Sequence, residues 1–132
     1  MTIIWSDDRA GVDWQELEAL YRAAPLGNKN ADDLEVVFGN SMFCCFARDN
    51  GRLVGAGRVL ADGRDCAYLC DVAVLPSHQG LGLGKQIIER LVAQSRSHTK
   101  IPSARLSGSR RCTMLGSRSS PEPKQLWRYQ SC

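Results

Sequence analysis

A glycine-rich stretch in the middle of the chain has the residue types and the spacing of an anion-binding loop. Gly80, Gly82 and Gly84 alternate, so the backbone can adopt positive φ angles and approach a ligand closely. An apolar strand precedes this loop, and an amphipathic helix is predicted to begin at about Gly84. The N–H groups of the loop and the positive end of the helix dipole therefore converge, which favours binding of a phosphate or pyrophosphate.

Spacing separates three phosphate-binding patterns. A Walker loop needs a glycine five residues before the Gly-Lys pair and Ser or Thr after it, but Gln79 and Gln86 stand at these positions. The dinucleotide fingerprint needs Gly-x-Gly-x-x-Gly and an acidic residue about 20 residues later, and both are missing here. The third pattern, Arg/Gln-x-x-Gly-x-Gly/Ala after a strand, is met by Gln79, Gly82 and Gly84.

The third pattern follows Val72-Ala-Val-Leu-Pro76, and this combination resembles the acetyl-CoA-binding motif of the GCN5-related N-acetyltransferases, the GNAT family. The resemblance implies a transferase that uses acetyl-CoA as co-substrate. It would pass the acetyl group to a primary amine by direct attack in a ternary complex. The residues expected to bind acetyl-CoA are Val72, Ala73, Val74, Gln79, Gly80, Leu81, Gly82, Leu83, Gly84 and Lys85.

The first 100 residues have the order of elements that this family would have. Asn30 is a good N-cap for a helix, and Asn50-Gly51 is a strong hairpin signal. The predicted elements are a strand at 3–5, helices at about 12–24 and from 31, strands at 42–48, 52–60 and 66–74, and the helix after the glycine loop. We therefore expect an α+β, three-layer α/β/α fold with a mixed, mainly antiparallel sheet in the order β-α-α-β-β-β-α.

The pattern ends at about residue 100. Residues 1–100 are predicted to form a GNAT-like acetyl-CoA-binding domain, and 101–132 an atypical Ser/Arg-rich basic tail. The first segment holds 11 basic and 13 acidic residues, a net charge of −2. The tail holds six basic residues and Glu122 alone, a net charge of +5. All the basicity of the chain therefore lies in the segment that does not resemble the family.

Three explanations of the tail stay open. It is a disordered basic extension, or it contacts an anion or a nucleic acid through Arg110-Arg111 and Trp127-Arg128-Tyr129, or it comes from a shifted reading frame or a truncation. The abrupt loss of pattern favours the third, and six scattered basic residues make nucleic acid the weakest. The carboxy-terminal third of the fold is then incomplete. The predicted strand at 66–74 would have an open edge, which a homodimer would cover.

Asp71 is the candidate catalytic residue because it is the acidic residue beside the reacting end of the expected site. By resemblance, it would take the amine proton through water, while a backbone N–H near Val72 would polarise the thioester carbonyl. The opposing interpretation is a carboxylate paired with an arginine. Tyr68 is expected on the sheet face opposite to Asp71. No tyrosine, Tyr129 included, matches the family's general acid, and His78 is expected to face solvent.

Six cysteines show no metal-ligand spacing, so we predict no metal and reduced thiols that serve as small core hydrophobes. The chain has neither a signal peptide nor an apolar run of membrane-spanning length, which predicts a cytoplasmic protein without a membrane partner. The rival function is a non-catalytic acyl-CoA-binding or dimerisation module with a basic, partner-binding tail.

Overall fold

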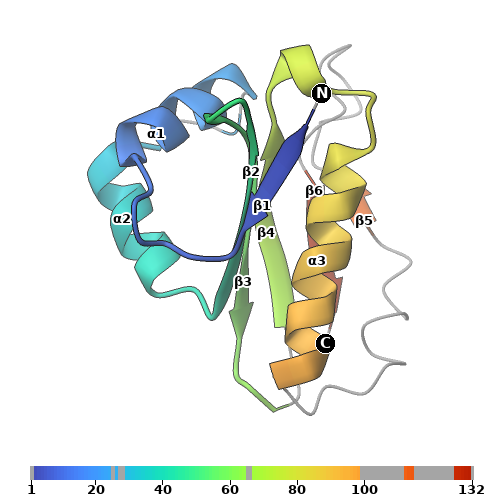
Figure 1. The fold of residues 1–132 in the computed structure, drawn as a ribbon. Helices are drawn as coiled ribbons and strands as arrows, with labels where there is room; N and C mark the ends of the chain where they lie inside the picture. The colour runs from blue at the N-terminus through green and yellow to red at the C-terminus, as the bar shows by residue number, and fades with distance from the viewer. Residues whose placement is uncertain are drawn as a thin grey trace.

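A computed structural model describes residues 2–24, 26, 29–64, 67–98, 112–114 and 127–131. Six strands form one sheet in the order β1-β2-β3-β4-β6-β5, and every described pair of neighbouring strands is antiparallel. Figure 1 shows α1 and α2 on one face of the sheet and α3 on the other. The elements are β1 (Ile3–Ser6), α1 (Trp14–Ala23), α2 (Ala31–Gly39), β2 (Phe43–Asp49), β3 (Arg52–Ala61), β4 (Ala67–Val74), the 3₁₀ turn η1 (Pro76–His78), α3 (Leu83–His98), β5 (Cys112–Met114) and β6 (Trp127–Ser131).

Local signals in the sequence account for α1, α2 and the β2–β3 hairpin. The Asp13 carboxylate caps α1, and the Asn30 side chain caps α2 by accepting from Asp33 N at 2.9 Å. Asn50 and Gly51 both have positive φ, at 50° and 79°, as a two-residue hairpin turn requires. The predicted fold class and the order of its elements through α3 are confirmed.

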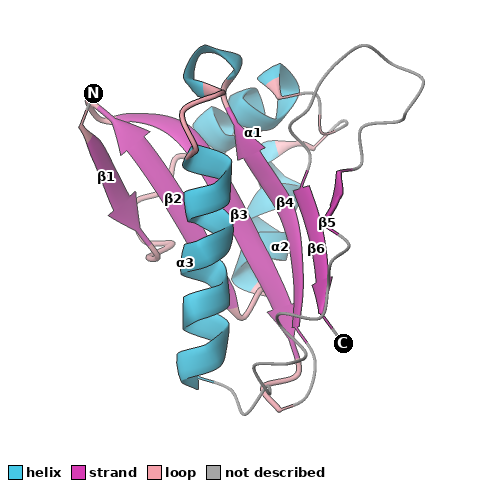
Figure 2. Cartoon of the chain, turned by 90° about the vertical axis from the view of Figure 1, so that its right-hand side faces the viewer, coloured by secondary structure: helices cyan, strands magenta, loops and turns pink. Residues whose placement is uncertain are grey.

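Helix α3 packs directly onto the backbone of β3. A Cβ atom at Gly57 would lie 2.9 Å from Ile87 Cγ2, 3.0 Å from Leu91 Cδ1 and 3.1 Å from Val72 Cγ2. A Cβ atom at Gly55 would lie 2.9 Å from Ile87 Cδ1. Only glycine leaves room for this approach, so these two positions set how deeply α3 sits on the sheet (Figure 2).

The outer edge of β4 has a partner, which corrects the expectation of an open edge. Strand β6 pairs with β4, with Ala67 opposite Ser131 and Val72 opposite Trp127, and β5 pairs with the far side of β6 (Figure 2). Apolar and polar residues alternate in β6 only from Trp127 to Gln130, a stretch too short to stand out in the Ser/Arg-rich tail. Strand addition rests on backbone hydrogen bonds, which any sequence without proline can supply, so the pattern missed it.

Candidate acetyl-CoA site

The glycine loop connects η1 to α3 with the backbone that its sequence predicts. Gly80 and Gly82 have φ angles of 78° and 80°. Gly84 differs from its neighbours because it lies in the first turn of α3, which begins one residue earlier than predicted. A Cβ atom at Gly80 or Gly82 would meet nothing within 4 Å, so the outer surface of the loop is open. An open loop at the N-terminus of a 16-residue helix fits a pyrophosphate group.

The side chains of the motif hold the loop in place. Gln79 Nε2 donates to the carbonyl oxygen of Val74 at 3.0 Å, which ties the loop to the end of β4. Leu83 is buried beneath the loop, and Leu81 is half exposed on its outside. Lys85 extends into solvent, with Nζ 3.8 Å from Glu89 Oε1. Its ammonium group therefore lies at the surface, beside the N-terminus of α3.

His78 links η1 to the end of β2 through Asp49. The prediction that His78 faces solvent was therefore wrong. Its Nε2 lies 2.9 Å from Asp49 Oδ2, and its side chain is 15% exposed. Its Nδ1 lies 2.8 Å from the Ser77 hydroxyl. Asp49 ends β2, far from His78 in sequence, so sequence alone offered no partner for the imidazole.

Strand β4 carries a bulge at Asp71. This residue has φ 55°, which is rare outside glycine, and the register with β3 shifts between Ala56 and Arg58. The register with β6 shifts between Leu69 and Val72. A strained residue that breaks the ladder on both sides of one strand is typical of a functional position.

The bulge also overturns the predicted face of Tyr68. Arg58 lies directly opposite Cys70, so these two side chains share a face of the sheet. The Arg58 side chain nevertheless reaches the Asp71 carboxylate. Because the positive φ at Asp71 interrupts the alternation, Tyr68, Cys70 and Asp71 are on the same side of β4.

The Asp71 carboxylate sits in a buried cluster of polar groups beneath α1. Arg58 Nε donates to Oδ2 at 2.7 Å, and Lys29 Nζ lies 3.2 Å from Oδ1. The Tyr21 hydroxyl donates to the backbone carbonyl of Asp71 at 2.6 Å. Only 6% of the Asp71 side chain is exposed. The predicted alternative, pairing with an arginine, is therefore present, and a lysine is present as well.

Burial and neighbouring charges shift the pKa values of Tyr21 and Arg58, the two residues that hydrogen-bond to Asp71. Burial raises the pKa of Tyr21 well above its usual value, and the negative charge of Asp71 raises it further. Burial alone would lower the pKa of Arg58. Cys70 and the hydrogen bond from Arg58 to Asp71 outweigh that effect, so the Arg58 pKa lies above its usual value. At neutral pH the cluster thus contains a neutral phenol and a charged guanidinium.

Three members of this cluster escaped prediction from the sequence. Tyr21 lies on the buried face of α1 with Leu17 and Leu20, where a helical spacing of apolar residues indicates only a core position. Lys29 lies in the connection between the two helices. Arg58 gave the one usable signal, because a charged residue inside an otherwise apolar, buried strand needs a partner.

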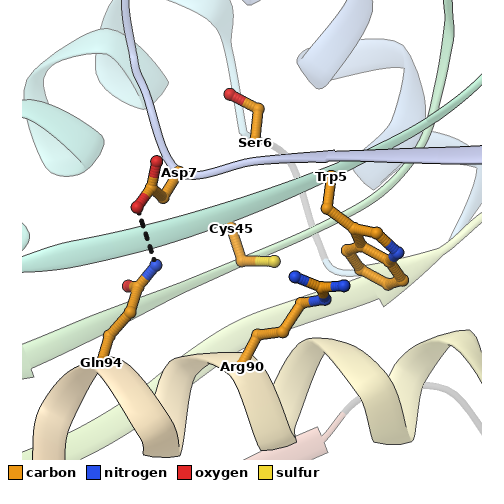
Figure 3. A pocket seen from close by; sticks show the side chains of 6 residues that line it. All are labelled: Trp5, Ser6, Asp7, Cys45, Arg90 and Gln94. Atoms are coloured by element: carbon orange, nitrogen blue, oxygen red, sulfur yellow. Dashed lines mark hydrogen bonds between the residues drawn. The ribbon is translucent and has the colours of Figure 1, made fainter. Parts of the chain in front are cut away.

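A hollow lies on the α3 face of the sheet, separate from the polar cluster around Asp71. Its volume is about 190 Å³, and it is lined by Trp5, Ser6, Asp7, Cys45, Arg90 and Gln94 (Figure 3). The Arg90 guanidinium lies 4.3 Å from the centre of the Trp5 ring, and Gln94 donates to Asp7. These residues belong to β1, β2, α3 and the position just after β1, so the hollow lies between these elements. Burial raises the pKa of Cys45 to about 12, so its thiol is protonated and packs as a small core residue.

Among the described residues, His, Cys, Asp and Glu form no group of three suited to a metal ion. In the same ranges, no helix combines the length and the apolar character that crossing a bilayer requires. Cys44, Cys45 and Cys70 are buried thiols, as predicted for that part of the chain.

Fold and site together define an α+β domain with an open glycine loop between β4 and a long helix. Residues 10–108 match the sequence profile of the acetyltransferase (GNAT) family. The chain therefore belongs to this family, whose members use acetyl-CoA, and the predicted resemblance is confirmed.

Curated relatives match part of the chain. The GCN5-related N-acetyltransferase 3, chloroplastic, of Arabidopsis thaliana is 36% identical over 80 residues, which are 59% of this chain and 33% of that protein. The serotonin N-acetyltransferase 2, chloroplastic, of Oryza sativa subsp. japonica is 52% identical over 46 residues, 35% of this chain and 23% of that protein. The chain thus spans about a third or less of the length of these relatives.

Solved structures share the fold. A probable acetyltransferase from meticillin-resistant Staphylococcus aureus has 25% sequence identity and a TM-score of 0.66, with 76% of each chain covered. A GNAT family acetyltransferase from Brucella melitensis, solved in complex with acetyl-CoA, has 23% identity and a TM-score of 0.56. That match covers 73% of this chain and 70% of the other.

Proposed function

We propose that this chain is an N-acetyltransferase that moves the acetyl group of acetyl-CoA to a primary amine by direct attack in a ternary complex. The observation that carries the proposal is the open glycine loop, with two positive φ angles, at the N-terminus of α3 in a GNAT chain. The acetyl-CoA complex of the Brucella melitensis neighbour supports the choice of donor.

The proposed binding site runs from β4 to the first turn of α3. Backbone N–H groups between Gln79 and Lys85 would hold the pyrophosphate, since the loop surface is open and the dipole of α3 favours negative charge. The Lys85 ammonium would add a positive charge at the rim. Beyond Val72, which pairs with Trp127, the backbone groups of Ala73 and Val74 would hydrogen-bond the pantetheine arm as a neighbouring strand would.

The proposed chemistry uses the bulge in β4. When bound, acetyl-CoA supplies an activated acetyl thioester. The backbone N–H near Val72 would stabilise the negative charge that develops on the thioester oxygen, because the register with β6 shifts between Leu69 and Val72 and leaves this stretch of β4 irregularly paired. Asp71 would anchor the incoming ammonium and take its proton through water. The strained φ of Asp71 and its burial support this role.

The two ion pairs of Asp71 favour the rival function. Both carboxylate oxygens of Asp71 are already occupied, by Arg58 and Lys29, which leaves less room for an incoming amine and suits a non-catalytic acyl-CoA-binding module. We keep a cytoplasmic location, a homodimer and the division at residue 100 as predictions. Two relatives named as chloroplastic provide a competing location.

Calorimetric titration with acetyl-CoA, desulfo-CoA and ADP tests the binding site. We expect saturable binding of the first two ligands, much tighter than that of ADP. The informative variant is Gly82→Ala, and its matched control is Gly11→Ala, because Gly11 has φ 78° and equal open space but lies before α1. Both should lose about 1 kcal/mol of stability from the left-handed backbone. Only Gly82→Ala should weaken acetyl-CoA binding, by about tenfold.

An amine panel then separates an enzyme from a binding module. The panel contains serotonin, an aminoglycoside, a polyamine and a lysine-containing peptide, of which the first two follow from the names of relatives and neighbours. Release of CoA thiol that depends on one of these amines, together with the acetylated product, supports the enzyme. Tight acetyl-CoA binding without product from any amine or from the chain itself supports the module. If acetyl-CoA does not bind at all, both functions are excluded.

A further inference from the structure

The connection between α1 and α2 places a primary amine of this chain against the β4 bulge. Lys29 Nζ lies 3.2 Å from Asp71 Oδ1 and 5.9 Å from the centre of the Tyr21 ring. The Lys29 side chain is 27% exposed, whereas Asp71 is 6% exposed. The amine therefore lies at the entrance to the buried cluster, where solvent and ligands can reach it.

This position meets the needs of an acceptor. In the proposed function, an acceptor amine must contact Asp71 and lie near the backbone N–H that polarises the thioester. Lys29 Nζ already contacts Asp71, and Val72 is the next residue along β4. Helix α1 packs on both β3 and β4, which keeps the connection that carries Lys29 close to this part of the sheet.

We propose that Lys29 is an acceptor for the chain's own activity and that acetyl-CoA acetylates its Nζ atom. The inference rests on the proposed function and names one amine that the same site would use. It also gives the Lys29–Asp71 pair a role beyond charge neutralisation.

The transfer balances without a further reactant. Lys29 Nζ forms a bond to the carbonyl carbon of the acetyl group, while the bond from that carbon to the sulfur of CoA breaks. The ammonium group loses two protons. One passes by way of Asp71 Oδ1 to water, and the other goes to the departing sulfur. The products are acetyl-lysine, CoA thiol and one proton in solution.

Arg58 makes the product compatible with the fold. Acetylation removes the positive charge of Lys29, but Arg58 Nε keeps its 2.7 Å hydrogen bond to Asp71 Oδ2. The buried carboxylate is thus still paired after the reaction. The acetylated chain should remain folded, so the modified product can accumulate and be measured.

Lys85 provides a comparison within the same chain. Its side chain is 80% exposed, against 27% for Lys29. Acetylation by a reagent from solution follows exposure and should modify Lys85 first. Transfer inside a site follows position, because holding two reactants together raises their effective concentration. The order in which these two lysines react therefore distinguishes the two routes.

The experiment incubates the purified full chain with acetyl-CoA and follows it by intact mass and peptide mapping. A parallel sample receives acetic anhydride. We expect acetyl-CoA to modify Lys29 at least about tenfold faster than Lys85, at a rate per molecule that does not depend on protein concentration. Acetic anhydride should show the reverse order. Faster modification of Lys85 by acetyl-CoA would overturn the inference.

Two variants separate a chemical role of these residues from a structural one. Lys29→Arg keeps a cation on Asp71 but cannot accept an acetyl group, so one modification should vanish while the unfolding temperature stays the same. Asp71→Asn should slow acetylation of Lys29 by acetyl-CoA but leave its labelling by acetic anhydride unchanged. Equal slowing of both reactions would show that Asp71 only positions the side chain, and the proposed transfer would be wrong.

The amine panel keeps failure of the inference distinct from failure of the proposed function. If Lys29→Arg acetylates an external amine while Lys29 of the parent chain stays unmodified, the inference is wrong and the proposed function stands. If no external amine and no lysine of the chain is acetylated, both are wrong.

Discussion

The Arg58–Asp71 pair should contribute far more to stability than any exposed ion pair of the chain, and one substitution tests this. Arg58→Met removes the guanidinium 2.7 Å from a carboxylate that is 6% exposed. Loss of one partner of a buried pair costs about 3–5 kcal/mol, because the other charge stays buried. Lys29 still lies 3.2 Å from Asp71, so we expect a smaller loss, about 2–4 kcal/mol. The matched control is Arg22→Met, since Arg22 is 76% exposed and pairs with Glu18 at 3.5 Å. It should lose about 0.3–0.5 kcal/mol.

Urea unfolding at neutral pH, followed by circular dichroism, measures both free energies. A thermal scan should show Arg58→Met unfolding about 10 °C below the parent chain. The double variant Arg58→Met/Asp71→Asn should recover about half of the loss, because no uncompensated charge is then buried. If Arg58→Met is no more destabilising than Arg22→Met, Asp71 is not held as a buried charge, and the structural basis for its role at the bulge is refuted.

Three further predictions concern packing, pH and the loop. Gly57→Ala should destabilise the chain by about 1–3 kcal/mol in urea unfolding, because α3 leaves no room for a methyl group at this position. The control Gly39→Ala, which has open space in α2, should be neutral or stabilising. Equal effects of the two substitutions would contradict the close approach of α3. The Cys45 pKa rises on folding from 9.0 to about 12, so its stabilising contribution is complete below pH 9.0 and is lost as pH rises toward 12. Cys45 alone should therefore lower the unfolding free energy by roughly 2 kcal/mol between pH 8 and about pH 10.5, and Cys44, whose pKa is raised to about 11, adds to this loss. Cys45→Ala should shrink the total difference by its own share; an unchanged pH profile would count against it. His78→Ala should weaken acetyl-CoA binding several-fold in a calorimetric titration by releasing η1 from Asp49, while an unaltered affinity would show that this contact does not support the loop.

The sequence correctly predicted the helix caps, the hairpin turn and the glycine loop, because each of these depends only on residues adjacent in the chain. Asp13 and Asn30 cap the helices that follow them, and Asn50-Gly51 forms the predicted turn. The glycine loop belongs to the same group, because Gly80 and Gly82 adopt positive φ for reasons contained in a few consecutive residues. This is why the order of elements and the acetyl-CoA motif could be predicted without the structure.

The tail shows where sequence pattern was a poor guide. Strand β6 covers the edge of β4 through backbone pairing, although apolar and polar residues alternate in it over only four positions, Trp127 to Gln130. An expectation based on side chains therefore left the β4 edge open. The backbone groups that close it are common to all residues except proline, so they leave no trace in composition.

The sequence by itself determined the family, the glycine loop and the helix that supports it. Tertiary structure decided the surroundings of Asp71, because Tyr21 and Lys29 reach it from the α1 region while Arg58 reaches it from the next strand. The bulge at Asp71 then turned its side chain to the face that these residues share. Such contacts join residues far apart in the chain, and their geometry depends on the register of the whole sheet, which no local pattern of residues encodes.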